Sequence, residues 1–118
     1  MFDFEKLEVY KKANSLNVEI LKYLCSTRRI DPYTKDQLKR ATLSMLFNLA
    51  EGVGRVTVPD KKHFYTIARG SVFECVAIIN LMRGVGELDD ELHRKFYDGY
   101  DEISRMLLAI YRKTKKMI

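Results

Sequence analysis

Cysteine and histidine are scarce in this chain of 118 residues, which holds two of each and no tryptophan. Cys25 and Cys75 are far apart in the sequence, and neither lies close to His63 or His93. A structural zinc site needs four such ligands, usually in closely spaced pairs, so this pattern excludes one. Both cysteines lie among apolar residues, and we expect reduced thiols that pack as small hydrophobic groups. The sequence therefore predicts neither a metal site nor a disulfide.

Proline and glycine are also few, with two and six copies. Long segments without these residues favour helices. We find no apolar run that approaches the roughly 18 residues needed to cross a bilayer. Residues 1–6 carry mixed charge and lack the basic-then-apolar pattern of a secretion signal. We therefore expect a single cytoplasmic domain that spans residues 1–118.

Motifs of known catalytic sites are missing as well. The chain has no phosphate-binding loop, no zinc-ligand spacing and no nucleophile elbow. A ferritin-like di-metal site needs a glutamate three residues before a histidine on each of two helices. The corresponding positions before His63 and His93 hold Asp60 and Asp90, which are better explained as acids in first helical turns. We predict that the protein is not an enzyme and carries no cofactor.

Apolar residues recur every three or four positions along four segments, which is the spacing of amphipathic helices. The connections between these segments are short, so sequential helices must run antiparallel. The sequence therefore predicts an all-α, up-down-up-down four-helix bundle. The predicted boundaries are residues 4–27 for the first helix, a capping box of Thr34 and Gln37 at the start of the second, Thr57 to residues 84–86 for the third, and a start near Asp89 for the fourth. The third helix is predicted to bury Phe64, Ile67, Ala68, Ser71, Cys75, Ile78, Ile79 and Met82.

Four polar residues fall on or beside the predicted inner faces of the second and third helices. Because the chain reverses near Val58, residues equidistant from that turn lie level with one another. We therefore hypothesise a hydrogen-bonded cluster in the seam between these helices. Polar groups inside bundles more often fix register and partner choice than perform chemistry, so we favour a structural role over a ligand or nucleic-acid contact, and either over catalysis. The members are Asn48, Glu51, Arg69 and Ser71, with Arg55 as an i,i+4 ion-pair partner of Glu51.

The net charge of +5 is concentrated at one end of the sequence. Residues 105–118 hold five basic residues and no acid, so the remaining 16 bases and 16 acids of residues 1–104 cancel. In an antiparallel bundle this end lies beside the end of the second helix and the start of the third. Clustered cations bind phosphates, although cations in a last turn also complement the helix dipole. The candidate nucleic-acid contacts are Arg55, Lys61, Lys62, Arg112, Lys113, Lys115 and Lys116.

Aromatic residues are numerous for so thin a bundle, with seven tyrosines and six phenylalanines. Several fall partly off the predicted core faces, and aromatic side chains are enriched at protein interfaces. The alternative is a broad core face with ordinary aromatic residues at its edges. The candidate interface residues are Phe2, Phe4, Phe47, Tyr65, Phe73 and Tyr97.

Four stretches, taken together and in order, resemble the 23S rRNA intervening-sequence protein family of small bacterial four-helix bundles. They are Leu7-Glu8-Val9-Tyr10-Lys11-Lys12-Ala13, Gln37-Leu38-Lys39-Arg40-Ala41-Thr42-Leu43-Ser44-Met45, Asn48-Leu49-Ala50-Glu51-Gly52-Val53-Gly54-Arg55 and Phe64-Tyr65-Thr66-Ile67-Ala68-Arg69-Gly70-Ser71-Val72-Phe73-Glu74.

This resemblance implies a compact bundle that assembles into a ring, with a homopentamer as the expected form, and it implies no defined molecular activity. The family is similar to the accessory variability proteins of diversity-generating retroelements, which bind nucleic acid and a reverse transcriptase. We therefore expect a non-enzymatic ring that binds RNA or DNA through basic bundle ends. The alternative is a scaffold for another protein, without nucleic-acid contact.

Overall fold

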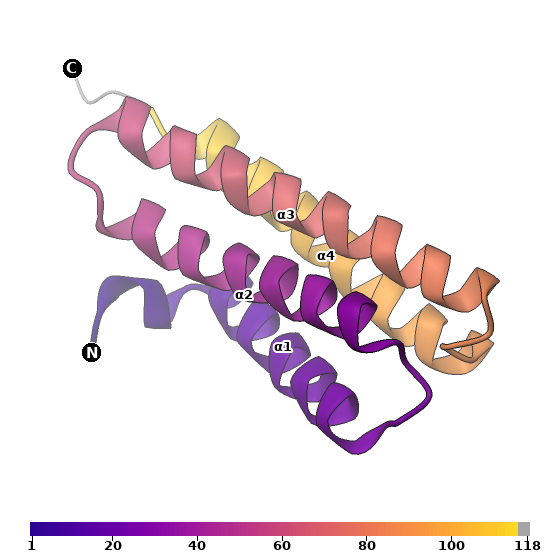
Figure 1. The fold of residues 1–118 in the computed structure, drawn as a ribbon. Helices are drawn as coiled ribbons and strands as arrows, with labels where there is room; N and C mark the ends of the chain where they lie inside the picture. Colours follow the sequence, from indigo (N-terminus) through magenta and orange to yellow (C-terminus); the bar gives the residue numbers. More distant parts are fainter. Residues whose placement is uncertain (116–118) are drawn as a thin grey trace.

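The computed structural model describes residues 1–115, so Lys116 lies outside the described part of the chain. Those residues form a short 3-10 helix, four α-helices and no strand, arranged as an antiparallel bundle of 53 × 25 × 22 Å (Figure 1). The predicted all-α four-helix bundle is confirmed. The elements are η1 (Asp3–Lys6), α1 (Glu8–Ser26), α2 (Pro32–Gly54), α3 (Val58–Gly84) and α4 (Asp90–Lys113).

Each α-helix packs against its neighbours in the chain, and α1 also packs against α4, which closes the bundle. The backbones of the diagonal pairs, α1 with α3 and α2 with α4, do not approach each other closely within residues 1–115, although the Thr42 hydroxyl of α2 reaches the Tyr100 hydroxyl of α4. The seam between α2 and α3 is the most extensive, while α1 is held more lightly. Figure 1 shows the four helices side by side, with α1 beside α2 and α3 beside α4.

The first helix and the start of the second differ from the prediction. Residues 4–27 do not form one helix, because Leu7 is extended (φ −79°, ψ 134°) and separates η1 from α1. The second helix starts at Pro32, before the predicted capping box of Thr34 and Gln37. Its N-cap is Asp31, whose carboxylate accepts hydrogen bonds from the backbone N–H groups of Tyr33 and Thr34. Proline fits the first helical position because it has no N–H to satisfy.

The last two helices begin where the sequence predicts, at Thr57 and near Asp89, and these two residues are their N-caps. The Thr57 hydroxyl accepts from the Asp60 N–H at 3.3 Å, and the Asp89 carboxylate accepts from the Leu92 N–H at 2.8 Å. The glycine segment ends α3 in a Schellman arrangement, in which the N–H of Glu87 reaches the Met82 carbonyl at 2.8 Å. Gly86 has a φ of +80° at this turn, a conformation that side chains rarely adopt. Local sequence therefore sets these three helix ends.

The residues that α3 buries are shifted slightly around the helix from those that the sequence predicts. Tyr65 and Val72 are buried, whereas Phe64 is half-buried and Ile67 is 37% exposed. The cause is Gly52 on α2, where an added Cβ would lie 2.7 Å from Cε1 of Tyr65. The absent side chain leaves the space that the Tyr65 ring fills. Tyr65 was expected at an interface, and that prediction is wrong because only 3% of it is exposed.

Two further expectations need correction. Cys75 is buried as predicted, but Cys25 is exposed near the end of α1. By length and composition α3 is also apolar enough to cross a membrane, contrary to our expectation for this chain. In the bundle α3 packs on both α2 and α4, and 33% of its most apolar window is buried inside the structure.

Candidate functional site

Three helix ends meet at the end of the bundle where α2 finishes, α3 begins and α4 finishes (Figure 1). We call the described cations here, Arg55, Lys61, Lys62, Arg112, Lys113 and Lys115, the basic end. Lys61, Lys113 and Lys115 line one hollow of about 850 Å³ with residues 56–59. Residues 51–66 and 106–115 together hold these six basic residues against two acids, Glu51 and Asp60, a balance of +4. The tertiary structure therefore brings most of the excess positive charge of the chain to one end of the bundle.

Two lysines of the basic end tie neighbouring helices together. Lys61 Nζ donates to the Val53 carbonyl at 2.7 Å, which satisfies a free carbonyl at the end of α2. Lys62 Nζ lies 4.8 Å from the centroid of the Tyr111 ring on α4. Their ammonium groups keep hydrogen-bonding capacity for a phosphate, because each has three donors.

Arg55 sits at the α2–α3 side of this surface. Its guanidinium pairs with the Glu51 carboxylate and lies 4.6 Å from the centroid of the Phe64 ring. Glu51 is therefore engaged with Arg55 rather than with the seam. Arg112 and Lys113 are exposed on the last turn of α4, and Lys115 is exposed just beyond it.

The predicted polar cluster divides into separate parts. Asn48 Nδ2 donates to the carbonyl and the hydroxyl of Ser44, and the Ser44 and Ser71 hydroxyls are 2.9 Å apart. Asn48 and Ser71 are thus joined through Ser44, which the sequence analysis did not include. Arg69 instead turns toward α4, where its Nε donates to the Ser104 carbonyl at 3.4 Å. At 100° per residue, positions 69 and 71 lie roughly 200° apart around a helix and cannot share a seam.

A second buried polar network was missed in the sequence analysis. The Thr42 hydroxyl donates to Asn17 Oδ1 at 2.6 Å and accepts from the Tyr100 hydroxyl at 2.8 Å. Asn17 Nδ2 also donates to the Thr42 carbonyl at 2.7 Å. The buried Cys75 side chain adjoins Tyr100 and Thr42, so residues from all four α-helices meet at this place. Burial raises the pKa of Cys75 to about 11 and raises that of Tyr100 well above its usual range. Both groups stay protonated, which suits a structural network and not a nucleophile.

Replacing Thr42 with valine, which has nearly the same shape, tests the weight of this network. The change leaves Asn17 Oδ1 and the Tyr100 hydroxyl without their partner in a buried place. We expect a loss of about 2 kcal/mol in the free energy of unfolding, measured with urea. The double variant Thr42→Val with Tyr100→Phe should lose less free energy of unfolding than the sum of the losses in the two single variants. Strict additivity would show that the contacts are independent.

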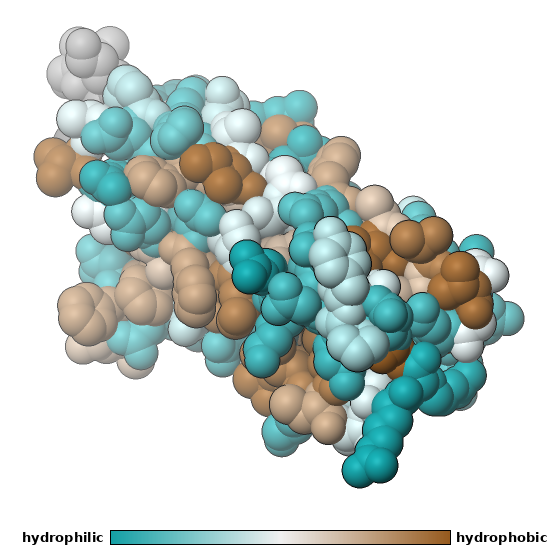
Figure 2. All heavy atoms as spheres, in the orientation of Figure 1, coloured by the Kyte–Doolittle hydropathy of each residue, from teal (hydrophilic) through white to brown (hydrophobic). Residues whose placement is uncertain are grey.

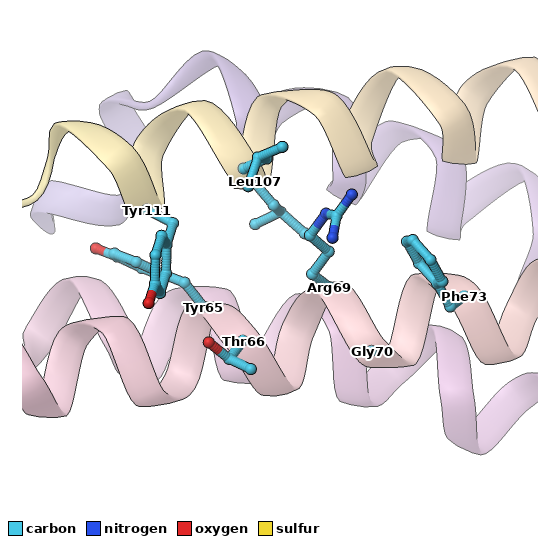
Figure 3. A pocket seen from close by; sticks show the side chains of 8 residues that line it. Tyr65, Thr66, Arg69, Gly70, Phe73, Leu107 and Tyr111 are labelled. Carbon is cyan, nitrogen blue, oxygen red and sulfur yellow. The ribbon is translucent and has the colours of Figure 1, made fainter.

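A groove runs between α3 and α4 and adjoins the basic end. Its volume is about 360 Å³, and it is lined by both apolar and aromatic groups. Figure 3 shows Tyr65 and Tyr111 at one end, Phe73 at the other, and Arg69 between them. The Arg69 guanidinium lies 4.8 Å from the centroid of the Phe73 ring. The lining residues of this α3/α4 groove are Tyr65, Thr66, Arg69, Gly70, Phe73, Leu107, Leu108 and Tyr111.

The model of a protein family described as 23S rRNA-intervening sequence protein matches residues 5–109. The chain belongs to this family. A solved structure of a protein with unknown function from the S23 ribosomal protein family of Bacteroides thetaiotaomicron VPI-5482 has the same fold, with a TM-score of 0.81 at 20% sequence identity. The alignment covers 87% of this chain and 97% of that one. No match was found among curated proteins. The resemblance drawn from the motifs is confirmed.

Five of the six aromatic residues predicted at an interface form two groups on the surface, and the sixth, Tyr65, is buried. Phe2 and Phe4 stack with ring centroids 6.0 Å apart, and Phe4 and Phe47 line a hollow on the outer side of α2. We call Phe2, Phe4 and Phe47 the N-terminal aromatic patch; Phe2 is 73% exposed and Phe47 61%. Phe73 and Tyr97 line a hollow between α3 and α4. Tyr65 is the buried exception. On the face drawn in Figure 2, apolar residues form separate patches among polar ones.

His93 joins α4 to α3 at the opposite end of the bundle. Its Nε2–H donates to Asn80 Oδ1 at 2.7 Å, and its Nδ1 accepts from Arg83 Nη1 at 3.3 Å. Both ring nitrogens are engaged only when the imidazole is neutral. Burial and the Arg83 guanidinium lower the pKa of His93; Arg94 adds to this effect and Asp90 opposes it. Within residues 1–115, no group of three or more His, Cys, Asp or Glu is placed to hold a metal ion.

This lowered pKa predicts a pH dependence of stability. The unfolded chain protonates His93 near its ordinary pKa of 6.5, before the folded protein does. Stability from this residue is therefore complete above pH 6.5 and is lost as the pH falls below it. We expect the urea midpoint to drop between pH 7.5 and 5.5, and His93→Gln to reduce that drop. His63→Gln removes the exposed histidine as a control, and an equal effect of both changes would contradict the prediction.

Proposed function

We propose that this protein is a non-enzymatic nucleic-acid-binding protein that acts as a homo-oligomeric ring in the bacterial cytoplasm. The convergence of Lys61, Lys62, Lys113 and Lys115 on one end of the bundle carries the proposal. Lysines at this surface neutralise phosphates and release counterions, which is the main source of sequence-independent binding to nucleic acid. The proposal needs no catalytic group, in keeping with the protonated thiol of Cys75 and the structural role of His93.

Assembly would multiply this weak site. Each protomer offers a few phosphate contacts, and a symmetric ring repeats the same contacts around its axis. Linked sites bind far more tightly than single ones because the later contacts form intramolecularly. A ring of five copies is the form that the family resemblance favours.

Filter binding of labelled RNA and DNA across a salt series tests the proposal. We expect retention at about 50 mM salt and a steep, log-linear loss of affinity as salt rises. The slope reports the number of phosphates neutralised. Absence of retention at the lowest salt, for both RNA and DNA, would remove the proposed function. Sedimentation of the same sample gives the number of copies.

The N-terminal aromatic patch favours a second candidate function, a scaffold that contacts protein rather than nucleic acid. Phe47 is 61% exposed on α2, beside the stacked pair Phe2 and Phe4. Exposed aromatic clusters of this kind mark association surfaces.

The change Phe47→Lys tests whether this patch joins copies of the chain. Because the side chain is mostly exposed, the change should leave the stability of the protomer within about 0.5 kcal/mol. We expect the dissociation constant of the oligomer to rise at least about tenfold, since an interface anchor contributes more than 1 kcal/mol. Sedimentation velocity measures the shift, with Tyr33→Lys as the matched exposed aromatic. An unchanged oligomer in Phe47→Lys would assign the patch to a different partner or to none.

A further inference from the structure

Gly70 lies in the middle of α3, where the fold gives no reason for a glycine. Gly52 and Gly99 also lie inside helices, but an added Cβ would meet Tyr65 at 2.7 Å or Leu16 at 3.0 Å. At Gly70 an added Cβ would meet nothing within 4 Å, and its φ is not positive. Glycine weakens a helix interior because it gains more freedom on unfolding than alanine does. The chain tolerates this cost at a position that its own packing leaves open.

Gly70 lines the α3/α4 groove (Figure 3). Because Gly70 has no side chain, the α3 wall of the groove is bare backbone between Arg69 and Phe73. A bare backbone in such a place permits close approach by another molecule. The groove therefore has the form of a site for something outside this chain.

The charges around the groove select an anionic occupant with a flat apolar surface. Arg69 stacks against the Phe73 ring and Lys62 against the Tyr111 ring, so each end of the groove pairs a cation with an aromatic face. None of the residues that line the groove is acidic. Positions 62 and 69 are about 10 Å apart along α3 at 1.5 Å per residue. Aromatic faces and arginine planes stack on nucleobases, while the adjoining cations bind phosphates.

The groove is continuous with the basic end through shared residues. Lys62 belongs to the basic end and stacks on Tyr111, which lines the groove. Tyr111 also lies only four residues before Lys115, on the last turn of α4. A strand whose phosphates lie on the basic end therefore reaches the groove without crossing another element.

We propose that the α3/α4 groove binds an unstacked base of single-stranded nucleic acid whose phosphates lie on the basic end. This inference rests on the proposed function and adds the class of nucleic acid to it. In a duplex the bases are paired and stacked, so none is free to enter the groove. Phe73 and Tyr111 supply the stacking faces, and Arg69 supplies donors to the base edge or its phosphate.

Fluorescence anisotropy with a labelled single strand of about 16 nucleotides, as RNA and as DNA, and with the matching duplex tests this inference. Phe73→Ala should weaken single-strand binding about tenfold and leave duplex binding unchanged, because stacking is lost and phosphate contacts remain. Gly70→Leu should fold at least as stably as the parent, since helix propensity improves, and should weaken single-strand binding by filling the groove. Tyr33→Ala and Gly84→Leu, at exposed positions away from the groove, are the matched controls.

The outcomes separate this inference from the proposed function. If the parent protein binds neither strands nor duplex at low salt, the proposed function fails and the inference fails with it. If the parent binds but Phe73→Ala and Gly70→Leu bind single strands as the parent does, the inference is overturned while the proposed function stands. If Gly70→Leu changes the sedimented mass and leaves single-strand affinity intact, the groove is an interface between copies and the inference is also overturned.

Discussion

Reversing the charge of Lys113 and Lys115 together is expected to weaken nucleic-acid binding about 100-fold or more at moderate salt. Each lysine that contacts a phosphate contributes about one unit to the salt slope, so the double change should lower that slope by about two. The glutamates add repulsion at the same surface. In a ring the loss repeats in every copy, which enlarges the effect. Filter binding of the variant and the parent over one salt series measures both quantities.

A control variant must show whether binding weakens because charge is lost at the basic end or because the net charge of the whole protein falls. Lys22→Glu with Lys39→Glu changes the net charge equally at exposed positions of α1 and α2, away from the basic end. We expect this pair to retain most of the binding. Glutamates near the end of α4 oppose the helix dipole and cost about 0.3–1 kcal/mol each, so unfolding is measured for both variants. Equal loss of binding in both pairs would mean that long-range charge, and not the basic end, holds the nucleic acid.

Replacing Gly52 with leucine is expected to give the largest loss of stability, about 3 kcal/mol. The first added atom alone would lie 2.7 Å from Cε1 and 2.9 Å from Cδ1 of Tyr65, and 3.0 Å from Cβ of Phe64. The Tyr65 ring is almost fully buried and cannot move aside without disturbing the core. The extra side chain must therefore push α2 and α3 apart along their extensive seam. Urea unfolding measures the loss.

Gly54 offers a matched control two residues later in the same helix. An added Cβ there meets nothing within 4 Å, so Gly54→Ala should change the free energy of unfolding by less than about 1 kcal/mol. If Gly52→Leu is tolerated as well as Gly54→Ala, the close approach of Tyr65 does not constrain the seam. A large loss at both positions would point to the loop that follows α2 instead.

Local sequence predicted the helices and several of their ends. The helices α3 and α4 begin at Thr57 and Asp89 as expected, because an N-cap depends on residues only two or three positions away. The start of α2 was misplaced because two valid signals compete there. Thr34 and Gln37 have the spacing of a capping box, but Asp31 followed by Pro32 has the same chemistry one turn earlier.

Features set by contact between helices were harder to predict. The rotation of the α3 face depends on the space above Gly52, which exists only once α2 and α3 are paired. The α3/α4 groove likewise needs the register of two helices to be known. The separation of Arg69 from Ser71, in contrast, follows from helix geometry and could have been found by counting. The charge at residues 105–118 was visible in the sequence, and its position beside Lys61 followed from the antiparallel order of the helices; the structure adds that Lys61, Lys113 and Lys115 line one hollow.

The hydrogen bonds among Asn17, Thr42 and Tyr100 favour one of the two possible handednesses of the bundle. Four amphipathic helices with the same loops can wind around a common axis in either sense, and apolar stripes distinguish the two senses poorly. Thr42 faces Asn17 of α1, whereas Ser44, two positions later, faces Ser71 of α3. In a bundle of the opposite handedness, α1 and α3 would exchange sides of α2. The hydroxyls of Thr42 and Ser44 would then face apolar groups without hydrogen-bond partners. The hydrogen bonds of Thr42 and Ser44 thereby favour the observed handedness of the bundle over the opposite one.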